Sequence, residues 1–458
     1  MEHTGVNIEW VFPTAGTDGA QAFNVMLASD TLPDIIYWGL MKDVERLMEE
    51  GVVRDLTDYM AEYSPAYYEF LQSNEIYDKY MKTDSGKYYG YGFFREDGGW
   101  NDTYLGPVIR QDWLDELGLD TPKTISDWDE VIRAFNEKYD AVLSFAWSRF
   151  KTTGISGAFG AYGAIDFQMY IDENNKVQLA QAQEEWKNYM AKLNEWWEAG
   201  LLDQDVMTID DRAAQTKALN GVMGISITSM GQLTNWRTDA EQAGTGANWI
   251  GLQYPKGDDG TLSMVFGGPG IGDSASVITT SCPAEKLEIA MRLLDYAYTD
   301  EGFLYWNFGT KGVSWDYDEN GEPAYTELVT QDPDGLNNAI SKYSGSVWSG
   351  SCIQATKLLY LKNTEEAVKA NDLWYYENKD VAENWKFPTG VTFTTDESNE
   401  LDELVSAIST YVSEMAVKYI TGEESLDNFD DFLEQLDAMG LQRVLEIYQE
   451  AYDRFLAR

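Results

Sequence analysis

The chain is poor in the residues that most enzymes use for covalent or acid–base chemistry. It contains one histidine, His3, and two cysteines, Cys282 and Cys352, among 458 residues. Because His3 stands at the start of the chain, we expect no Ser-His-Asp or Cys-His arrangement and no histidine-rich zinc site. Two cysteines cannot make a disulfide framework. A single bridge between them is one alternative, and two unpaired thiols are the one we favour.

Basic residues and long apolar runs are also scarce. There are 33 Lys and Arg against 78 Asp and Glu, a formal net charge of −45, and such a field repels nucleic acid and anionic lipid headgroups. We find no run of about 18 apolar residues that would predict a membrane-spanning helix, and we recognise no signal peptide. The hydrophobic and charged contents, 44% and 24%, are typical of globular proteins. The length predicts two or three packed units.

Aromatic residues, in contrast, are abundant. They make up 14% of the chain and include 16 Trp and 29 Tyr. A buried Trp needs a partner for its N–H group, so it is seldom used only to fill space. In a strongly acidic chain, this composition favours an uncharged ligand with a flat face, such as a sugar. Packing between helices is the alternative explanation for a large part of these residues.

Several motifs that would indicate catalysis or nucleotide binding are incomplete. Residues 154–158 read Gly-Ile-Ser-Gly-Ala and lack the last glycine of a nucleophile elbow. Residues 268–272 read Gly-Pro-Gly-Ile-Gly and miss the dinucleotide-binding fingerprint, because the third glycine comes one residue early. No glycine-rich loop ends in Gly-Lys-Ser or Gly-Lys-Thr. A glycoside hydrolase needs only two carboxylates, but no spacing among the 78 acidic residues selects a pair.

One metal-binding motif is complete in its spacing. A calcium-binding loop is matched by Asp316, Asp318, Asn320, Gly321 and Glu327. However, Pro323 interrupts the loop, and no amphipathic run precedes it as a preceding helix would require. Asp-Glu-Asn-Gly is also a favoured tight-turn sequence. We therefore favour a hairpin turn, keep calcium as the alternative and assign no cofactor.

The pattern of apolar residues predicts alternating strands and helices in the first part of the chain. Residues 6–12 alternate as a strand does, residues 19–29 have helical spacing, and Pro33 precedes an apolar strand that ends at Trp38. This alternation is typical of a parallel sheet. We expect further strands at 105–110, 141–145, 222–227 and 276–280, a hairpin turn at 172–176, and helices at 111–118, 126–135, 183–199, 401–420 and 429–456. Ser126 is expected to cap the second of these helices.

Several stretches, taken in order, resemble a known family. The most specific is Arg-Gln-Asp-Trp-Leu-Asp-Glu-Leu-Gly-Leu at 110–119, followed by Pro-Lys-Thr at 122–124. The others lie at 23–29 with 32–36, 50–57, 86–90, 293–296 with 300–302, 307–312 and 451–455. In this order they resemble the extracellular solute-binding proteins of ABC importers. The chain is most similar to the sugar-type family that includes maltose-binding protein, and within it to the large lipoprotein members of Gram-positive bacteria.

The resemblance implies an α/β, two-lobe, periplasmic-binding-protein-like fold of type II, with a ligand cleft between the lobes and a helical C-terminus. The first lobe would comprise residues 1–105 and 266–310, and the second 106–265 and 311–458. The chain would cross between them near 105–110, 262–267 and 309–315. Family members have a strand and a helix before the segment that opens here, so we expect the first strand of the first lobe to be missing.

In function, the resemblance implies a high-affinity extracellular receptor that delivers a carbohydrate or oligosaccharide to an ABC importer by lobe closure. It implies no enzymatic activity, no cofactor, the importer's permease subunits as partners and a monomeric state. It also implies anchoring to the cell surface as a lipoprotein in the full-length protein, with the signal and anchor absent from this chain. A secreted glycoside hydrolase, a surface-binding protein without a transport role, and a peptide or modified-sugar ligand remain as alternatives.

Trp38 is the first candidate ligand-binding residue. In sugar-binding relatives, an aromatic residue just after the corresponding strand stacks on the ligand. Ligands of open α/β sheets lie beyond the carboxyl ends of strands. The other candidates follow strands, precede the first crossover or, for the last, lie in a Gly- and Ser-rich stretch: Trp100, Asn101, Asp102, Thr103, Trp147, Arg149, Ser229, Met230 and Trp348. Each of these side chains also fits a role in packing within a lobe.

Replacing Trp38 by alanine tests its assignment. We expect Trp38→Ala to weaken ligand binding at least tenfold, because about 1.4 kcal/mol or more of stacking energy is lost. Isothermal titration calorimetry measures the dissociation constant of each form. An unchanged affinity would contradict the assignment.

Overall fold

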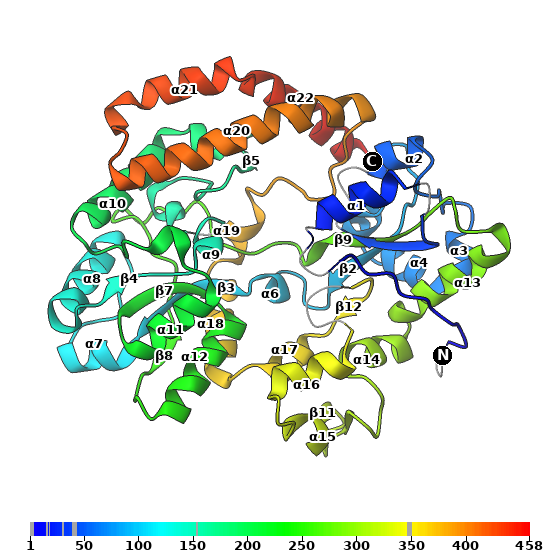
Figure 1. Ribbon diagram of the computed structural model, residues 1–458, viewed down its shortest axis with the longest axis horizontal. Coiled ribbons are helices and arrows are strands. Elements are labelled where there is room, and N and C mark those ends of the chain that lie inside the picture. The colour runs from blue at the N-terminus through cyan, green and yellow to red at the C-terminus, as the bar shows by residue number, and fades with distance from the viewer. Residues whose placement is uncertain are drawn as a thin grey trace.

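The fold is seen in a computed structural model that describes residues 4–14, 17, 19–29, 32–38, 44–152, 154–345 and 350–458. Within these ranges the side chains of Ala20, Trp38, Asp273 and Glu383 are not described. Two bodies, each built around a four-stranded sheet, lie side by side (Figure 1). The short helix α6 (Gly99–Asp102) lies between them, and the C-terminal helices pass over both.

The first sheet has the strand order β1-β9-β2-β12. Its strands are β1 (Ile35–Trp38), β2 (Tyr91–Arg95), β9 (Ile271–Ile278) and β12 (Ile353–Gln354). Strand β9 is antiparallel to β1 and to β2, whereas β12 is parallel to β2. The parallel sheet expected from the alternation of strands and helices is therefore wrong here. The reason is that β9 returns from the second sheet and enters the first in the direction opposite to its neighbours.

The second sheet has the strand order β4-β7-β3-β8. Its strands are β3 (Leu105–Arg110), β4 (Val142–Leu143), β7 (Met223–Ser229) and β8 (Trp249–Gly251). Strand β3 is antiparallel to β7 and β8, and β4 is parallel to β7. Every residue of β3 and β7 is buried. The expected strands at 105–110, 141–145, 222–227 and 276–280 thus correspond to β3, β4, β7 and the end of β9.

Helices surround both sheets (Figure 1), and two short hairpins lie outside the sheets, the first of them packed against the C-terminal helices. The body of the first sheet contains α1 (Gly19–Leu27), α2 (Val44–Glu49), α3 (Met60–Tyr63), α4 (Pro65–Gln72), α5 (Glu75–Tyr80), α13 (Ala284–Asp295), η4 (Tyr296–Tyr298), α14 (Asp300–Phe308), α15 (Glu327–Thr330), α16 (Leu336–Tyr343) and α17 (Thr356–Lys362). The body of the second contains α7 (Gln111–Leu117), α8 (Ile125–Tyr139), α9 (Trp147–Phe150), η1 (Ser156–Phe159), η2 (Ala180–Ala182), α10 (Glu184–Glu198), η3 (Val206–Thr208), α11 (Asp211–Asn220), α12 (Met230–Ala243), α18 (Glu365–Tyr376) and α19 (Lys379–Glu383). The hairpins are β5 (Met169–Ile171) with β6 (Val177–Leu179) and β10 (Trp315–Tyr317) with β11 (Pro323–Tyr325).

Helix α8 shows how the local sequence specifies an element. Its buried residues Trp128, Val131 and Phe135 lie on one face, as their spacing predicts. The cap, however, is Thr124 and not Ser126: Thr124 Oγ1 accepts a hydrogen bond from the backbone N–H of Asp127, and the Asp127 carboxylate accepts one from that of Thr124. This reciprocal pair satisfies two N–H groups that the first turn leaves free. The hydroxyl of Ser126 donates to Asp258 instead.

The strand expected at residues 6–12 is wrong. Residues 5–14 have no regular structure, and Ile8, Val11 and Phe12 are 46%, 78% and 76% exposed. A strand is stable only when another strand satisfies its backbone hydrogen bonds, and no described strand pairs with this segment. Alternation of apolar residues was therefore not enough to form the strand.

The division of the chain between the two bodies differs from the expected one in one segment. Ile353 and Gln354 pair with Phe94 and Arg95 of β2, so this part of residues 311–458 belongs to the first sheet. The expected crossover near residues 309–315 is replaced by a chain that stays with the first body through the β10–β11 hairpin and β12. It reaches the second body only at α18, which packs on β3 and β8. The other lobe boundaries remain a prediction.

The C-terminal helices are α20 (Thr395–Thr421), η5 (Leu426–Asn428), α21 (Phe429–Ala438) and α22 (Leu441–Ala457). Helix α20 packs on α10 of the second body and on α2 of the first, and α20 and α22 extend from one body toward the other in Figure 1. Cys282 and Cys352 are buried and unpaired, as favoured from the sequence. In the described part of the chain, no helix combines the length and apolar character that crossing a bilayer requires.

Candidate ligand cleft

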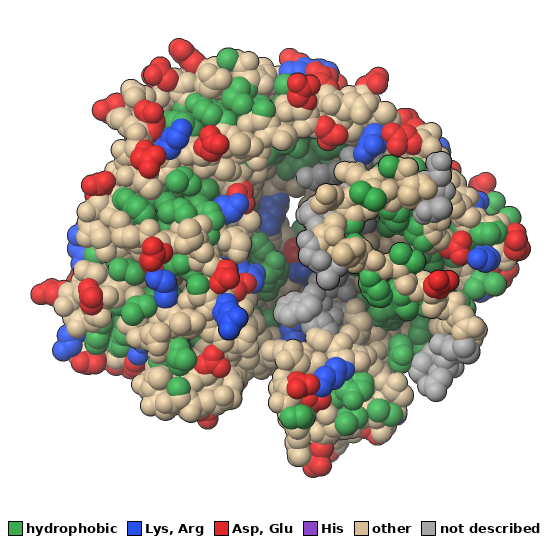
Figure 2. All heavy atoms as spheres, in the orientation of Figure 1, with side chains coloured by type: hydrophobic (Ala, Val, Ile, Leu, Met, Phe, Trp, Pro, Cys, Tyr) green, Lys and Arg blue, Asp and Glu red, His purple; other side chains and the backbone are tan. Residues whose placement is uncertain are grey.

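The chain passes between the two bodies at residues 96–104, 252–270, 363–364 and 384–394. Between the bodies the surface is hollowed, and Lys and Arg side chains stand on the wall of this hollow (Figure 2). We call it the cleft. Partly exposed side chains on the connecting stretches are the natural candidates for ligand contacts. They lie between the two bodies, and neither body covers them fully.

Arg95, at the end of β2, is held by the first connection. Its Nη1 donates to the carboxylate Oδ1 of Asp102 at 2.5 Å and to the backbone oxygen of Asn101 at 3.0 Å. The guanidinium also lies 5.6 Å from the ring centroid of Tyr104. Arg95, Asp102 and Tyr104 are partly exposed. The first connection therefore presents an ion pair and an aromatic ring side by side.

Two other connections bring a ring and a lysine to the same place. The ring of Phe266 meets that of Tyr104 edge to face, with centroids 5.0 Å apart. Lys386 Nζ lies 5.4 Å from the centroid of Phe266 and 5.7 Å from that of Trp385. Phe266 and Lys386 are also partly exposed. Sequence reasoning missed Tyr104, Phe266 and Lys386, although the first two adjoin or lie within expected crossovers.

Positive charge is concentrated here. Burial lowers the pKa of Lys386 to about 8, and the nearby charge of Arg95 acts in the same direction while Asp102 opposes it. Burial also lowers the pKa of Lys362 to about 8, again with a contribution from Arg95. Both lysines are therefore near enough to Arg95 for repulsion between like charges to matter.

Glycines allow these connections to approach one another closely. A Cβ atom on Gly268 would lie 2.0 Å from Oδ2 of Asp102 and 3.6 Å from Nζ of Lys386. A Cβ atom on Gly270 would lie 2.3 Å from Cα of Gly98. Residues 268–272, the glycine-rich stretch that misses the dinucleotide fingerprint, thus leave room for the Asp102 carboxylate and for the turn before α6.

We expect Gly268→Ala to lower the free energy of unfolding by about 1 to 3 kcal/mol, the usual cost of overpacking, and to weaken ligand binding, because the methyl group displaces the Asp102 carboxylate from Arg95. Calorimetric titration of Gly268→Ala, Asp102→Ala and the double variant measures this coupling. In the double variant the second substitution should cost little, since the displaced group is already gone. Fully additive losses would contradict the explanation.

Three of the predicted residues at the first connection turn inward. Trp100 is buried and its Nε1 donates to Asp372 Oδ1 at 2.8 Å. Asn101 is buried and its Oδ1 accepts a hydrogen bond from Thr356 Oγ1 at 3.1 Å. Thr103 is buried as well. In this conformation Trp100 and Asn101 hold α6 against α18 and α17, whereas Asp102 is partly exposed at the cleft.

The predicted residues of the second body have mixed positions. Arg149 makes a bidentate ion pair with Asp211, with N–O distances of 3.1 and 2.8 Å. These hydrogen bonds raise the pKa of Arg149, and the nearby Tyr104 acts in the same direction. Trp147 is partly exposed and packs near Phe150. Ser229 caps α12 through its hydroxyl oxygen, and Met230 is buried. Arg149 therefore lies toward the cleft, and Ser229 and Met230 have structural roles.

Two predicted residues cannot be placed in the site. Trp38 ends β1, with its backbone opposite Ala275, but its side chain lies outside the described part of the structure. Trp348 lies outside the described residues altogether. For these, as for the other candidates, contact with a ligand stays a prediction.

The sequence match to a calcium loop folds as a hairpin. Asp316 lies in β10, and the Asp318 carboxylate accepts hydrogen bonds from the backbone N–H groups of Asn320 and Glu322. The hairpin interpretation is confirmed. Among the described residues, no group of three or more His, Cys, Asp or Glu side chains is arranged to hold a metal ion.

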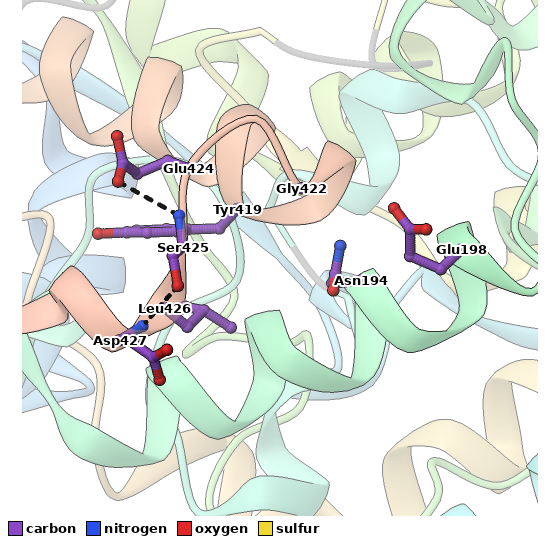
Figure 3. A pocket seen from close by; sticks show the side chains of 8 residues that line it. All are labelled: Asn194, Glu198, Tyr419, Gly422, Glu424, Ser425, Leu426 and Asp427. Atoms are coloured by element: carbon purple, nitrogen blue, oxygen red, sulfur yellow. Dashed lines mark hydrogen bonds between the residues drawn. The ribbon is translucent and has the colours of Figure 1, made fainter.

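A separate depression lies between α10 and the end of α20 (Figure 3). Its lining includes the carboxylates of Glu198, Glu424 and Asp427. The backbone N–H groups of Ser425 and Asp427 are satisfied within the loop itself, by Glu424 and by the Ser425 hydroxyl. This acidic depression is remote from the connections between the two bodies, so we do not assign it a ligand.

Known proteins resemble this chain over nearly its whole length. Residues 1–302 match the family described as bacterial extracellular solute-binding protein. The polygalacturonan/rhamnogalacturonan-binding protein YtcQ of Bacillus subtilis (strain 168) is 24% identical over 464 residues, covering 99% of this chain and 86% of YtcQ. The fructooligosaccharide ABC transporter substrate-binding protein FusA of Streptococcus pneumoniae serotype 4 (strain ATCC BAA-334 / TIGR4) is 22% identical over 496 residues, covering 100% of this chain and 86% of FusA.

Solved structures agree in fold. The alginate-binding protein AlgQ2 without calcium ion has a TM-score of 0.80 at 23% identity, with 95% of this chain and 89% of AlgQ2 covered. FusA of S. pneumoniae in complex with kestose has a TM-score of 0.76 at 21% identity, with 100% and 94% covered. The two-lobe α/β fold with a helical C-terminus is confirmed. The chain belongs to the bacterial extracellular solute-binding proteins.

Proposed function

We propose that the protein is a high-affinity receptor for an oligosaccharide, which it encloses between its two bodies and delivers to an ABC importer. The observation that carries the proposal is the set of partly exposed groups that meet at the cleft from separate connections. Tyr104 and Phe266 supply rings, and Arg95, Asp102 and Lys386 supply charged hydrogen-bonding groups.

This combination suits a sugar. The C–H faces of a pyranose ring pack on aromatic rings, while its hydroxyl groups need donors and acceptors placed close together. Closure of the two bodies would exclude water and so strengthen each hydrogen bond to the ligand. The relatives named above support the choice of ligand class, since YtcQ is named for binding pectic polysaccharides and FusA for fructooligosaccharides.

The remaining parts of the proposal follow from the family. Family members are binding proteins, so we propose that the ligand is released unchanged and that no reaction is catalysed. The permease subunits of the importer would receive it, and the receptor would act as a monomer. We further propose that the full-length protein is anchored at the cell surface as a lipoprotein, as the name of Lipoprotein LipO of B. subtilis (strain 168) describes for that relative.

A thermal-shift screen with neutral and acidic oligosaccharides and with peptides tests the function. A ligand at 100 times its dissociation constant should stabilise the protein by about 2.7 kcal/mol. Small-angle X-ray scattering should show a smaller radius of gyration with the bound ligand, because the two bodies close. Chromatography of the ligand after incubation should recover it intact. Cleaved ligand would instead support a glycoside hydrolase, and stabilisation by peptides alone would contradict the carbohydrate ligand.

A further inference from the structure

We infer that the ligand is an acidic oligosaccharide, one containing uronic acid, and that Lys386 and Arg95 bind its carboxylate in the cleft. The inference rests on the proposed function and specifies the class of its ligand. It departs from the uncharged ligand that the composition suggested.

Lys386 has no hydrogen-bond or ion-pair partner of its own within the described structure. Among the described residues, its ammonium group makes no hydrogen bond and no ion pair within 4 Å, and aromatic rings are what it meets. The nearby carboxylate of Asp102 is engaged by Arg95. An ammonium group has three donors, and a charge held among protein atoms without a partner is unfavourable. Because Lys386 is partly exposed, an anion that enters the cleft can reach it.

Arg95 also has an unused hydrogen-bond donor. One of its donors is committed to Asp102 and Asn101, but its Nε–H is buried and has no hydrogen-bond partner within the described structure. Arg95 pairs with Asp102, and its charge lowers the pKa of Lys386 while that of Asp102 raises it, so two cations share one carboxylate. In a chain with a net charge of −45, such a local excess of positive charge is a marked exception. An anionic ligand relieves the repulsion and supplies the missing acceptors.

Each of these two cations, Arg95 and Lys386, lies beside an aromatic ring. Tyr104 and Phe266 lie within 6 Å of the guanidinium and the ammonium respectively. A uronic acid unit has a carboxylate at one edge of its pyranose ring and C–H groups on its face. One unit can therefore contact a ring and a cation at the same time.

Matched trisaccharides test the inference. We compare α-(1→4)-linked trigalacturonate and β-(1→4)-linked trimannuronate with their carboxyl-reduced forms by isothermal titration calorimetry. The wild type should bind at least one acid form about tenfold or more tightly than its reduced form. Lys386→Met should remove most of that preference and change the affinity for the reduced form little. The control is Lys138→Met on α8, whose side chain is 53% exposed, and it should behave as the wild type does.

The dependence on pH gives a second readout. Burial holds the pKa of Lys386 at about 8, with Asp102 and Arg95 as the charged groups facing it. Lys386 is therefore charged below that pH and neutral above it, while a uronate stays ionised throughout. Affinity for the acid form should fall as the pH rises from 7 to 9, and affinity for the reduced form should not. Lys386→Arg should keep the preference for acid and lose this pH dependence.

Each outcome decides something. If the wild type binds the reduced forms as tightly as the acid forms, the acidic ligand is wrong and the oligosaccharide receptor stands. If it binds neither these nor any oligosaccharide of the screen, both proposals are wrong. Should Lys386→Met fail to fold, the comparison of acid and reduced forms on the wild type and on Lys386→Arg still decides the inference.

Discussion

Arg458→Met lowers the free energy of unfolding by about 3 kcal/mol or more in our expectation, because several buried acceptors lose their donor at once and each costs about 1 to 3 kcal/mol when left unsatisfied. Arg458 stands at the end of α22 with its side chain buried. Its guanidinium donates to Asp84, Thr392 and the backbone oxygens of Lys79, Lys82 and Gly390. These acceptors cannot all reach water once the donor is gone. Urea-induced unfolding followed by circular dichroism measures the change.

Arg443→Met is the matched control on the same helix. Arg443 is exposed and pairs with Glu400 and Glu446 at the surface. Such pairs are screened by salt and add little stability, so we expect no measurable change in Tm. If both variants lost the same stability, the buried acceptors around Arg458 would not be the cause, and a general weakening of α22 would explain the result.

Trp374→Ala is the second substitution with a large expected effect, about 3 to 5 kcal/mol, which is typical of removing a fully buried Trp. The indole of Trp374, on α18, lies so close to β3 that a Cβ on Gly106 would be 2.5 Å from it. Its Nε1 donates to the backbone oxygens of Pro107 at 3.2 Å and Leu252 at 3.1 Å. The substitution therefore leaves a cavity beside the central strand and removes a shared donor. Thermal unfolding followed by fluorescence should show one transition at a clearly lower Tm.

Tyr376→Ala separates the cavity from an effect on the helix. Tyr376 lies on the same helix as Trp374 and is 61% exposed. Its replacement should change the free energy of unfolding by no more than about 0.5 kcal/mol. An equal loss in the two variants would mean that aromatic residues support α18 as a helix, and not that Trp374 fills the space above Gly106.

The elements that the sequence predicted well are those that depend on interactions between residues close together in the chain. The face of α8 follows from the spacing of Trp128, Val131 and Phe135, and the turn at 172–176 follows from its polar residues, of which Asp172 accepts hydrogen bonds from the N–H groups of Asn174 and Lys176. Even here the cap was placed two residues late, because Ser126 and Thr124 are equally suitable in sequence. The choice depended on Asp258, which engages Ser126 from a distant loop.

The elements that were predicted wrongly depend on distant partners. Residues 6–12 alternate as a strand does but have no described strand beside them. The direction of β9 depends on where the chain returns from, which no local pattern records. The position of β12 depends on its pairing with β2, far earlier in the chain. Family resemblance supplied the two-lobe fold where these patterns could not.

The candidate site shows the same limit. Trp100, predicted to contact a ligand, is buried in this structure with its Nε1 donating to Asp372, and its contact with a ligand stays a prediction. Asp102, two residues later, does reach the cleft. Lys386 gave no signal in the sequence, because a single lysine is distinctive only once its neighbours are known. Arg95 and Lys386 come close together only because the end of β2 and residues 384–394 meet in the fold.

The C-terminal helices constrain how the two bodies can move. Two rigid bodies joined at one place can swing and twist freely, but α20 adds a second attachment, to α10 on one side and α2 on the other. Bodies held at two separated places keep one easy rotation, about the line that joins the attachments. We therefore expect the opening and closing of this protein to be a single hinge rotation without twist. A permease that contacts both bodies would then see two distinct surfaces, one for the empty receptor and one for the loaded receptor.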